Sequence, residues 1–185
     1  MSDPKIVSPP FGRQKSSPDA ATASETPGRY PTVRMRRNRS GDGVRRLVAE
    51  NKLSVDDLIW TSFVVDGENQ RVPVESMPGV VRYSPDVIAE AANEAFELGI
   101  PAIALFPFTD PDKKTPDGRE SLDPENLVCT AIRNIKAQVP DMMVVCDVAL
   151  DPYTSHGHDG VMDGEVILND ETVEILTKQA LNQAE

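Results

Sequence analysis

Carboxylate and imidazole side chains are concentrated in one short segment, residues 146–160, which reads CDVALDPYTSHGHDG. The segment holds three aspartates and both histidines of the chain: Asp147, Asp151, Asp159, His156 and His158. Oxygen and nitrogen donors of these types suit a divalent cation such as Mg²⁺, and imidazole suits acid/base chemistry near neutral pH. A structural role is the third alternative, in which an Asp-Pro turn forms and the histidines bond the loop backbone. The residue types alone leave all three alternatives open.

The elements around this segment predict a parallel sheet. Three largely apolar runs indicate buried strands at 58–65, 101–106 and 142–149, and the first of them is uncharged and rich in β-branched and aromatic residues. Helical periods at 84–98 and 123–138 separate these strands, and another helix follows residue 169. Alternating strands and helices favour an α/β fold with both sheet faces covered. The segment 146–160 leaves the carboxyl end of the third strand, which is the edge where such folds build their sites.

The helices carry recognisable start and stop signals. Ser84 and Pro85 fit a helix start, and Gly99 fits its end. We expect this helix to bury Val87, Ile88, Ala91, Ala95 and Leu98. Asn169 is the expected cap of the last helix, whose apolar face would be Val173, Leu176, Ala180 and Leu181. Between apolar residues of 161–168, the pair Asp163-Gly164 indicates a hairpin.

Charge divides the chain into a basic front and an acidic body. The net charge is −11, but residues 1–46 carry ten Lys or Arg against four Asp or Glu. We expect a disordered tail at 1–29, an arm with a short helix (43–51) at 30–53, and an α/β body at 54–185. The dense basic cluster at 34–39 (RMRRNR) has no accompanying nucleic-acid-binding motif. A solvated arm, or one that contacts the acidic body of another copy, is therefore favoured over contact with nucleic acid.

Other classes of protein are disfavoured by what the sequence lacks. No run of apolar residues is long enough for a membrane span, and the N-terminus has no apolar secretory signal. Neither phosphate-binding glycine motif, GxGxxG or GxxxxGK[ST], occurs, so we expect no nucleotide or organic cofactor. Cys129 and Cys146 lack a CxxC spacing and are expected to be free thiols of a cytoplasmic protein.

Several motifs in order resemble the delta-aminolevulinic acid dehydratase (porphobilinogen synthase) family. They are RMRRNR with GVRRLVAEN, LSVDDLIWTSFVVDG, SMPGVVRYS, GIPAIALFP, CDVALDPYTSHGHDG and GEVILNDETVEIL, and they cover residues 30–185. The resemblance implies the first three strand–helix units of an incomplete (β/α)8 barrel with an extended N-terminal arm. It also implies a homo-oligomer, a hexamer or octamer joined through that arm. The implied reaction condenses two 5-aminolevulinate molecules to porphobilinogen with loss of two waters.

The resemblance also assigns roles within residues 146–160. Asp147 would line the substrate pocket, whereas the other substrate-binding residues stay unassigned. Ala149, Asp151 and Asp159 stand where zinc-dependent members have cysteines, so zinc is disfavoured. Asp151 and Asp159 resemble the aspartate-type members, which use Mg²⁺, a monovalent cation or no active-site metal. They are the candidate Mg²⁺ ligands, and His158 matches the position of a secondary metal ligand in zinc-dependent members.

The family forms Schiff bases with lysines from later strands. Lys113, Lys114 and Lys178 do not match the family's lysine motifs. We therefore expect a truncated barrel that is inactive alone. The alternative is a non-catalytic α/β fragment that docks on other subunits or binds a metal.

Overall fold

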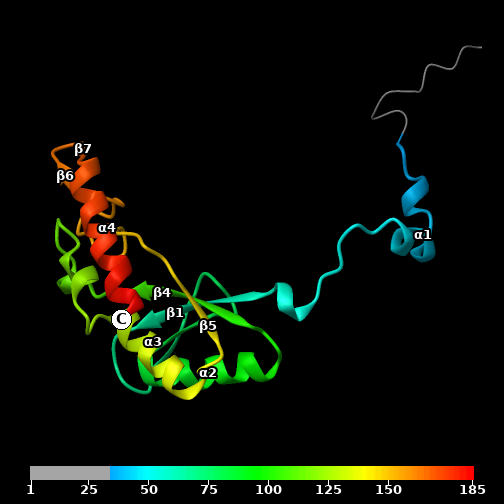
Figure 1. Ribbon diagram of the computed structural model, residues 1–185, viewed down its shortest axis with the longest axis horizontal. Coiled ribbons are helices and arrows are strands. Elements are labelled where there is room, and N and C mark those ends of the chain that lie inside the picture. The colour runs from blue at the N-terminus through cyan, green and yellow to red at the C-terminus, as the bar shows by residue number, and fades with distance from the viewer. Residues whose placement is uncertain (1–33) are drawn as a thin grey trace, which may run out of the picture. The chain divides into compact units, whose positions relative to one another are not determined.

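The computed structural model describes residues 34–185, so the predicted disordered tail lies outside the described residues. The chain divides into two compact units between Asn51 and Lys52 (Figure 1). In the first unit, a 3-10 turn, η1 (Arg37–Arg39), precedes the short helix α1 (Asp42–Leu47). The helix predicted at 43–51 thus ends four residues early. Leu47 and the C-cap residue Val48 are exposed, and no side chain of α1 is buried.

A five-stranded sheet forms the centre of the second unit, in the order β2-β3-β1-β4-β5. Its strands are β1 (Ile59–Val65), β2 (Arg71–Pro73), β3 (Val81–Tyr83), β4 (Ala102–Phe108) and β5 (Met143–Cys146). Strands β3, β1, β4 and β5 are parallel, whereas β2 runs antiparallel to β3. The predicted parallel α/β sheet is therefore confirmed. The β2–β3 pair was not predicted, because strands of three residues carry too short a pattern.

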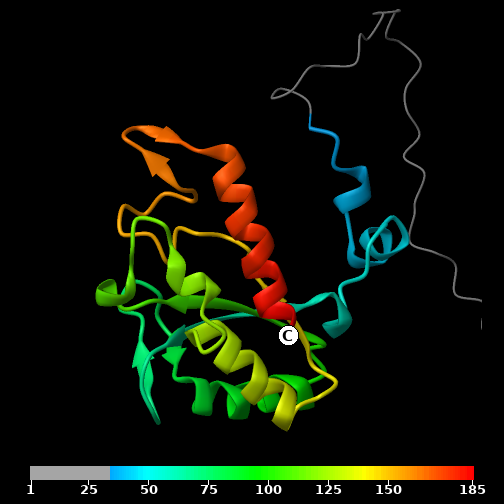
Figure 2. The same ribbon diagram turned by 60° about the vertical axis from the view of Figure 1, so that its left-hand side comes forward.

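Helices α2 (Pro85–Glu97) and α3 (Leu127–Gln138) lie side by side on one face of the sheet (Figures 1 and 2). Ile88 of α2, Ile135 of α3 and Leu105 of β4 meet in the core. As predicted, α2 begins after Ser84 and ends before Gly99, whose φ of 91° suits glycine. Leu98 was expected inside but is exposed, since it already stands at the C-cap of the helix.

The predicted start of α3 at Asp123-Pro124 is wrong by three residues. Asn126 occupies the cap instead, and its side-chain oxygen accepts a hydrogen bond of 2.9 Å from the Cys129 amide. The turn before it is closed by the Asn126 amide, which donates to the Asp123 carbonyl at 3.0 Å. An Asp-Pro pair and an Asn three residues later both fit a helix start, and only the tertiary context selects one.

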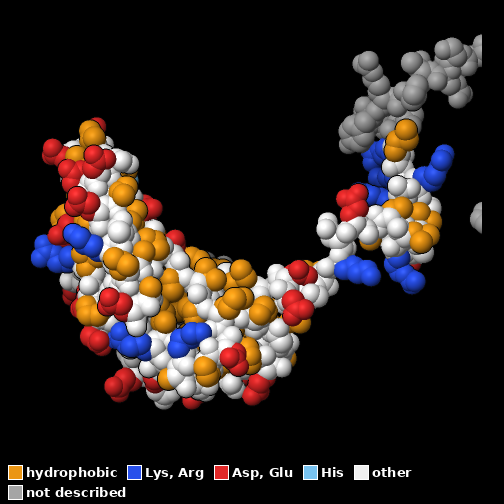
Figure 3. All heavy atoms as spheres, in the orientation of Figure 1, with side chains coloured by type: hydrophobic (Ala, Val, Ile, Leu, Met, Phe, Trp, Pro, Cys, Tyr) orange, Lys and Arg blue, Asp and Glu red, His pale blue; other side chains and the backbone are white. Residues whose placement is uncertain are grey.

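The opposite face of the sheet is largely uncovered, which contradicts the expectation that both faces are buried. On this face the side chains of Ile59 and Met143 are 56% and 58% exposed. Hydrophobic side chains are visible at the surface of this unit (Figure 3). The third strand is also shorter than the predicted 142–149, and its free edge has no strand partner among residues 34–185.

The last part of the chain forms a hairpin and a long helix. Strands β6 (Met162–Asp163) and β7 (Val166–Ile167) pair around Gly164, as predicted, and α4 (Asn169–Ala184) follows. Asn169 is the first helical residue, and the cap is Leu168. The predicted apolar face of α4 is wrong: Val173 and Leu181 are exposed, whereas Thr172 and Gln179 are buried.

Three further 3-10 turns occur in this unit: η2 (Val55–Asp57), η3 (Pro111–Lys113) and η4 (Arg119–Leu122). A search of residues 34–185 finds no helix both long and apolar enough to cross a membrane.

Candidate functional site

Two loops at the carboxyl edge of the sheet are joined by their backbones. One follows β4 and the other, residues 147–160, follows β5. The Thr115 amide donates to the Tyr153 carbonyl at 3.1 Å, and the Ser155 amide donates to the Thr115 carbonyl at 3.1 Å. This short parallel bridge fixes the two loops to each other. Because β4 and β5 are parallel neighbours, the residues that follow both strands meet at one edge.

Most polar groups of the β5 loop hold the loop itself. The Asp159 carboxylate accepts a hydrogen bond of 2.6 Å from the Leu150 amide. The Thr154 hydroxyl donates to the His158 carbonyl at 2.8 Å. Tyr153 and Thr154 are buried, and burial raises the pKa of the Tyr153 hydroxyl well above its usual range. This loop is therefore a rigid platform with a neutral tyrosine beneath it.

Both ring nitrogens of His156 are occupied by backbone groups. Its Nδ1 accepts from the His158 amide at 3.2 Å, and its Nε2 lies 3.1 Å from the Pro116 carbonyl oxygen. An accepting Nδ1 assigns the proton to Nε2, which then donates to Pro116. Of the three alternatives for the histidines, these contacts support the structural one for His156. The His158 ring lies 5.6 Å from that of His156 and lines neither described cavity.

A cavity of about 230 Å³ opens beside this platform. It is lined by Phe106, Pro107, Lys114, Asp147, Asp151, Pro152 and Tyr153. Asp147 directly follows β5 and continues its alternation, so it belongs with Met143 and Val145 to the uncovered sheet face. The structure thus brings Asp147 and Asp151 together and places Asp159 outside the cavity lining.

The carboxylates crowd one another. Partial burial raises the pKa of Asp151 above its ordinary value, and the neighbouring carboxylates Asp159 and Asp147 raise it further. Lys114 opposes this rise with its positive charge. The cavity therefore combines an ammonium with two carboxylates, and it can hold a small molecule that carries both kinds of charge.

Lys114 was not predicted as a site residue, and its neighbour explains its placement. The Lys113 ammonium turns away to Asp66, at 2.8 Å, and toward Glu120, at 3.8 Å. The hydrogen bond to Asp66 raises the pKa of Lys113. This ion pair anchors the β4 loop to the end of β1 while Lys114 reaches the cavity. The sequence signal that could have identified Lys114 as a site residue was its position, because both lysines follow the strand that neighbours β5.

The predicted metal ligands fit a preformed metal site poorly. One Asp159 oxygen already accepts from Leu150, and residues 34–185 contain no cluster of three His, Cys, Asp or Glu side chains suited to a metal ion. Ala149 offers no donor in place of a cysteine. The Mg²⁺ site of Asp151 and Asp159 therefore stays a prediction.

Comparison with known proteins decides the family. The family model described as "Delta-aminolevulinic acid dehydratase" matches residues 32–185. The chain belongs to the delta-aminolevulinic acid dehydratase family. The resemblance read from its motifs is therefore confirmed.

Two curated dehydratases illustrate the relationship. The one from Bradyrhizobium diazoefficiens is 52% identical over 173 residues, which are 94% of this chain and 48% of the relative. The one from Rhodobacter capsulatus is 42% identical over 84% of this chain and 47% of the relative. The chain thus spans about half the length of the curated dehydratases that it matches.

A solved dehydratase supports the fold as well. The crystal structure of the enzyme from Toxoplasma gondii ME49, in complex with the reaction product porphobilinogen, superposes with a TM-score of 0.74. It is 44% identical and covers 82% of this chain, which corresponds to 44% of the Toxoplasma chain. This likeness supports the α/β fold with its parallel sheet.

Proposed function

We propose that this chain forms the first part of a porphobilinogen synthase. The enzyme would condense two molecules of 5-aminolevulinate to porphobilinogen with loss of two waters. The observation that carries the proposal is the charged cavity at the carboxyl edge of a sheet from the dehydratase family. The product bound in the Toxoplasma relative supports the same substrate class.

The charges of the cavity suit this substrate. 5-Aminolevulinate carries an ammonium group and a carboxylate, and the cavity offers two carboxylates and one ammonium. The Asp147 carboxylate would accept hydrogen bonds from the substrate amine and orient it. Asp151 and Lys114 would balance the remaining charge, while Phe106 and Tyr153 supply apolar walls.

The finer architecture that we propose is the beginning of a (β/α)8 barrel. The bare sheet face would become the barrel interior, since interior positions of such barrels are filled by side chains from all strands. The free edge of β5 borders a groove of about 780 Å³. The groove runs along α3 and past the end of α4, and its apolar lining includes Ile59, Ile132, Met143 and Val145. Another strand could pair with β5 there and cover these side chains.

The Schiff-base step would need lysines that residues 1–185 do not supply. The Lys113 ammonium is occupied by Asp66, and Lys114 is the only lysine that lines the described charged cavity. Lys114 faces carboxylates, whereas an activated lysine nucleophile needs an apolar pocket or cationic neighbours. We therefore propose that residues 1–185 bind and orient substrate, and that condensation requires the later part of the barrel.

Assembly, metal use and location complete the proposal. The basic residues of 34–39 would contact the acidic body of another copy in a hexamer or octamer. If a metal binds the β5 loop, the aspartates favour Mg²⁺ over zinc, because no thiolate is present there. Cys129 and Cys146 are both free thiols, which suits the reducing cytoplasm.

The decisive experiment is a chimera in which residues 34–185 replace the matching half of the Bradyrhizobium relative. The chimera is supplied with 5-aminolevulinate, and porphobilinogen is measured by its colour reaction with Ehrlich's reagent. We expect product from the chimera and none from residues 1–185 alone. In the chimera, Asp147→Asn should lower kcat about 100-fold or more, because a positioned acid/base group contributes about that much.

The matched control is Asp141→Asn, a carboxylate in the exposed turn before β5 that should leave kcat unchanged. A folded, correctly assembled chimera without product would contradict the proposed function. Full activity of Asp147→Asn would refute the role of Asp147 alone. Self-association of residues 1–185 without any substrate binding would favour the alternative, a docking fragment.

A further inference from the structure

Helix α4 faces the site loop with amide side chains. The Gln179 side chain is fully buried, and its Nε2 donates to the Ala149 carbonyl at 3.1 Å. One helical turn later, the Gln183 Nε2 donates to the Asp147 carbonyl at 3.2 Å. Both amides therefore hold the main chain of the segment that carries Asp147.

The spacing of the two amide donors along α4 matches the spacing of the two carbonyl acceptors along the loop. Gln179 and Gln183 are four residues apart, which is a rise of about 6 Å along a helix and places both on one face. Asp147 and Ala149 are two residues apart, which is about 6.6 Å along an extended chain. A slide of α4 by one residue would break both hydrogen bonds, so together they set the register of α4 against the loop.

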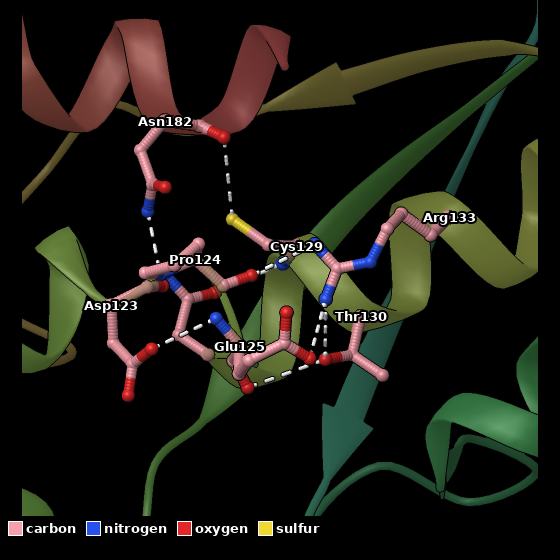
Figure 4. A network of polar contacts seen from close by, with 8 residues as sticks. Asp123, Pro124, Glu125, Cys129, Thr130, Arg133 and Asn182 are labelled. Carbon is pink, nitrogen blue, oxygen red and sulfur yellow. Dashed lines mark hydrogen bonds and ion pairs between the residues drawn. The ribbon is translucent and has the colours of Figure 1, made fainter.

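The end of α4 is tied down by a third amide (Figure 4). Asn182 Nδ2 donates to the carbonyls of Ser121, at 3.2 Å, and Asp123, at 3.0 Å. The Cys129 thiol in turn donates to the Asn182 carbonyl at 3.6 Å. The turn at residues 121–123, which accepts both hydrogen bonds from Asn182, is itself held by α3. These contacts therefore connect α3 to α4.

Arg133 of α3 supplies that hold (Figure 4). Its guanidinium donates to the Pro124 carbonyl at 2.8 Å and pairs with the Glu125 carboxylate at 2.9 Å. The chain of contacts thus runs from α3 through the turn to Asn182, and from α4 to the Asp147 main chain. Each link joins neighbouring elements by an observed hydrogen bond.

Asp147 depends on this support because its carboxylate has no hydrogen bond or ion pair to any residue of 34–185. The main chain of Asp147 therefore sets where this side chain begins and which way its Cα–Cβ bond points. We propose that Gln183, supported by Gln179, is a positioning residue that aims the Asp147 carboxylate into the charged cavity. The catalytic part of this inference rests on the proposed function. A misplacement of about 1 Å can cost about 100-fold in rate, so a main-chain hydrogen bond is enough to matter.

Gln183 is the residue to substitute, because Gln179 is wholly buried and its substitution would destabilise the fold. In residues 1–185, Gln183→Leu should shift the carbonyl ¹³C resonance of Asp147, whereas Gln138→Leu should not. Gln138 is the matched control: it is an exposed glutamine at the end of α3. In the active chimera, Gln183→Leu should lower kcat about 10-fold with KM changed less than twofold. Gln183→His, which keeps an N–H donor, should recover most of kcat.

The two readouts separate the outcomes. An unmoved Asp147 carbonyl signal in Gln183→Leu would overturn the inference at its first step. A moved signal with kcat equal to that of Gln138→Leu would show a hydrogen bond without positioning, which also overturns it. If the unmodified chimera makes no porphobilinogen, the proposed function fails and the catalytic role of Gln183 fails with it. The carbonyl signal would even then decide whether α4 holds the Asp147 main chain.

Discussion

The Asp159 carboxylate accepts a hydrogen bond from the Leu150 amide nine residues before it, at 2.6 Å. Leu150 is fully buried, so this contact closes the β5 loop over its own apolar centre. A carboxylate that closes a loop is a structural group first, whatever else it binds. Substitution of Asp159 therefore tests whether this residue stabilises the loop or serves only as a metal ligand.

Asp159→Ala should lower the free energy of unfolding by about 1–2 kcal/mol, because the Leu150 amide loses a charged acceptor. Asp159→Asn keeps an acceptor oxygen and should lose less than half of that. Urea unfolding of residues 1–185 followed by circular dichroism measures both. Equal stability of the wild type and Asp159→Ala in the absence of any metal would contradict the structural role.

The stability contribution of Asp151 should depend on pH. Burial and the carboxylates of Asp159 and Asp147 raise its folded pKa above the ordinary value of 3.8, so its charged form is disfavoured by folding. The penalty is complete above the folded pKa and disappears as pH falls through it toward 3.8. Because the side chain is largely exposed, we expect a penalty of about 0.5 kcal/mol or less.

Asp151→Asn should therefore stabilise the chain slightly at pH 7, and the difference should vanish near pH 4. The measurement is the urea midpoint of both proteins across that pH range. Asp141→Asn is the matched control, since its carboxylate lies in an exposed turn outside the cavity. A stabilisation that grows as pH falls would have the wrong sign and refute the electrostatic account.

Gly160 lies where the loop passes under the hairpin and α4. A Cβ at this position would stand 2.6 Å from Ile167 Cγ2 and 3.1 Å from the Thr172 hydroxyl. That hydroxyl also accepts from the Val161 amide at 3.0 Å, so it has little freedom to move. We expect Gly160→Ala to cost about 1–3 kcal/mol of folding stability through overpacking.

Gly164→Ala is the comparison variant, measured by thermal unfolding alongside Gly160→Ala. Gly164 has a φ of 59° and no atom within 4 Å of an added Cβ, so only backbone strain of about 1 kcal/mol is expected. If Gly160→Ala proved no more damaging than Gly164→Ala, the close approach of Ile167 would be without energetic consequence.

Cys146 should react slowly with alkylating agents in the folded chain. Burial raises the pKa of its thiol from 9.0 to about 11, which lowers the thiolate fraction near pH 8 about 100-fold. Iodoacetamide labelling followed by mass spectrometry gives the rate at Cys146 in native buffer and in 8 M urea. Similar rates in the two solutions would mean that the thiol is not protected by the fold.

Much of this protein was predictable from local pattern. Largely apolar runs predicted the three parallel strands, because a strand buried against helices needs little polar surface. Ser84-Pro85 and Gly99 marked the ends of α2 through backbone preferences that act within a few residues. The same locality placed Asp147 at the carboxyl end of a strand, which directed attention to it as a site residue.

The fold decided what lies beyond such local rules. Lys114 joins Asp147 and Asp151 in one cavity because β4 and β5 are parallel neighbours, and no sequence distance encodes that meeting. The buried face of α4 is polar because the loops beneath it present carbonyls that need donors, which outweighs the apolar preference of Val173 and Leu181. The sequence by itself thus determined the longer strands and helices and the family, through local backbone preferences and motifs. Only the tertiary structure decided which side chains meet, because that depends on neighbours distant in the chain.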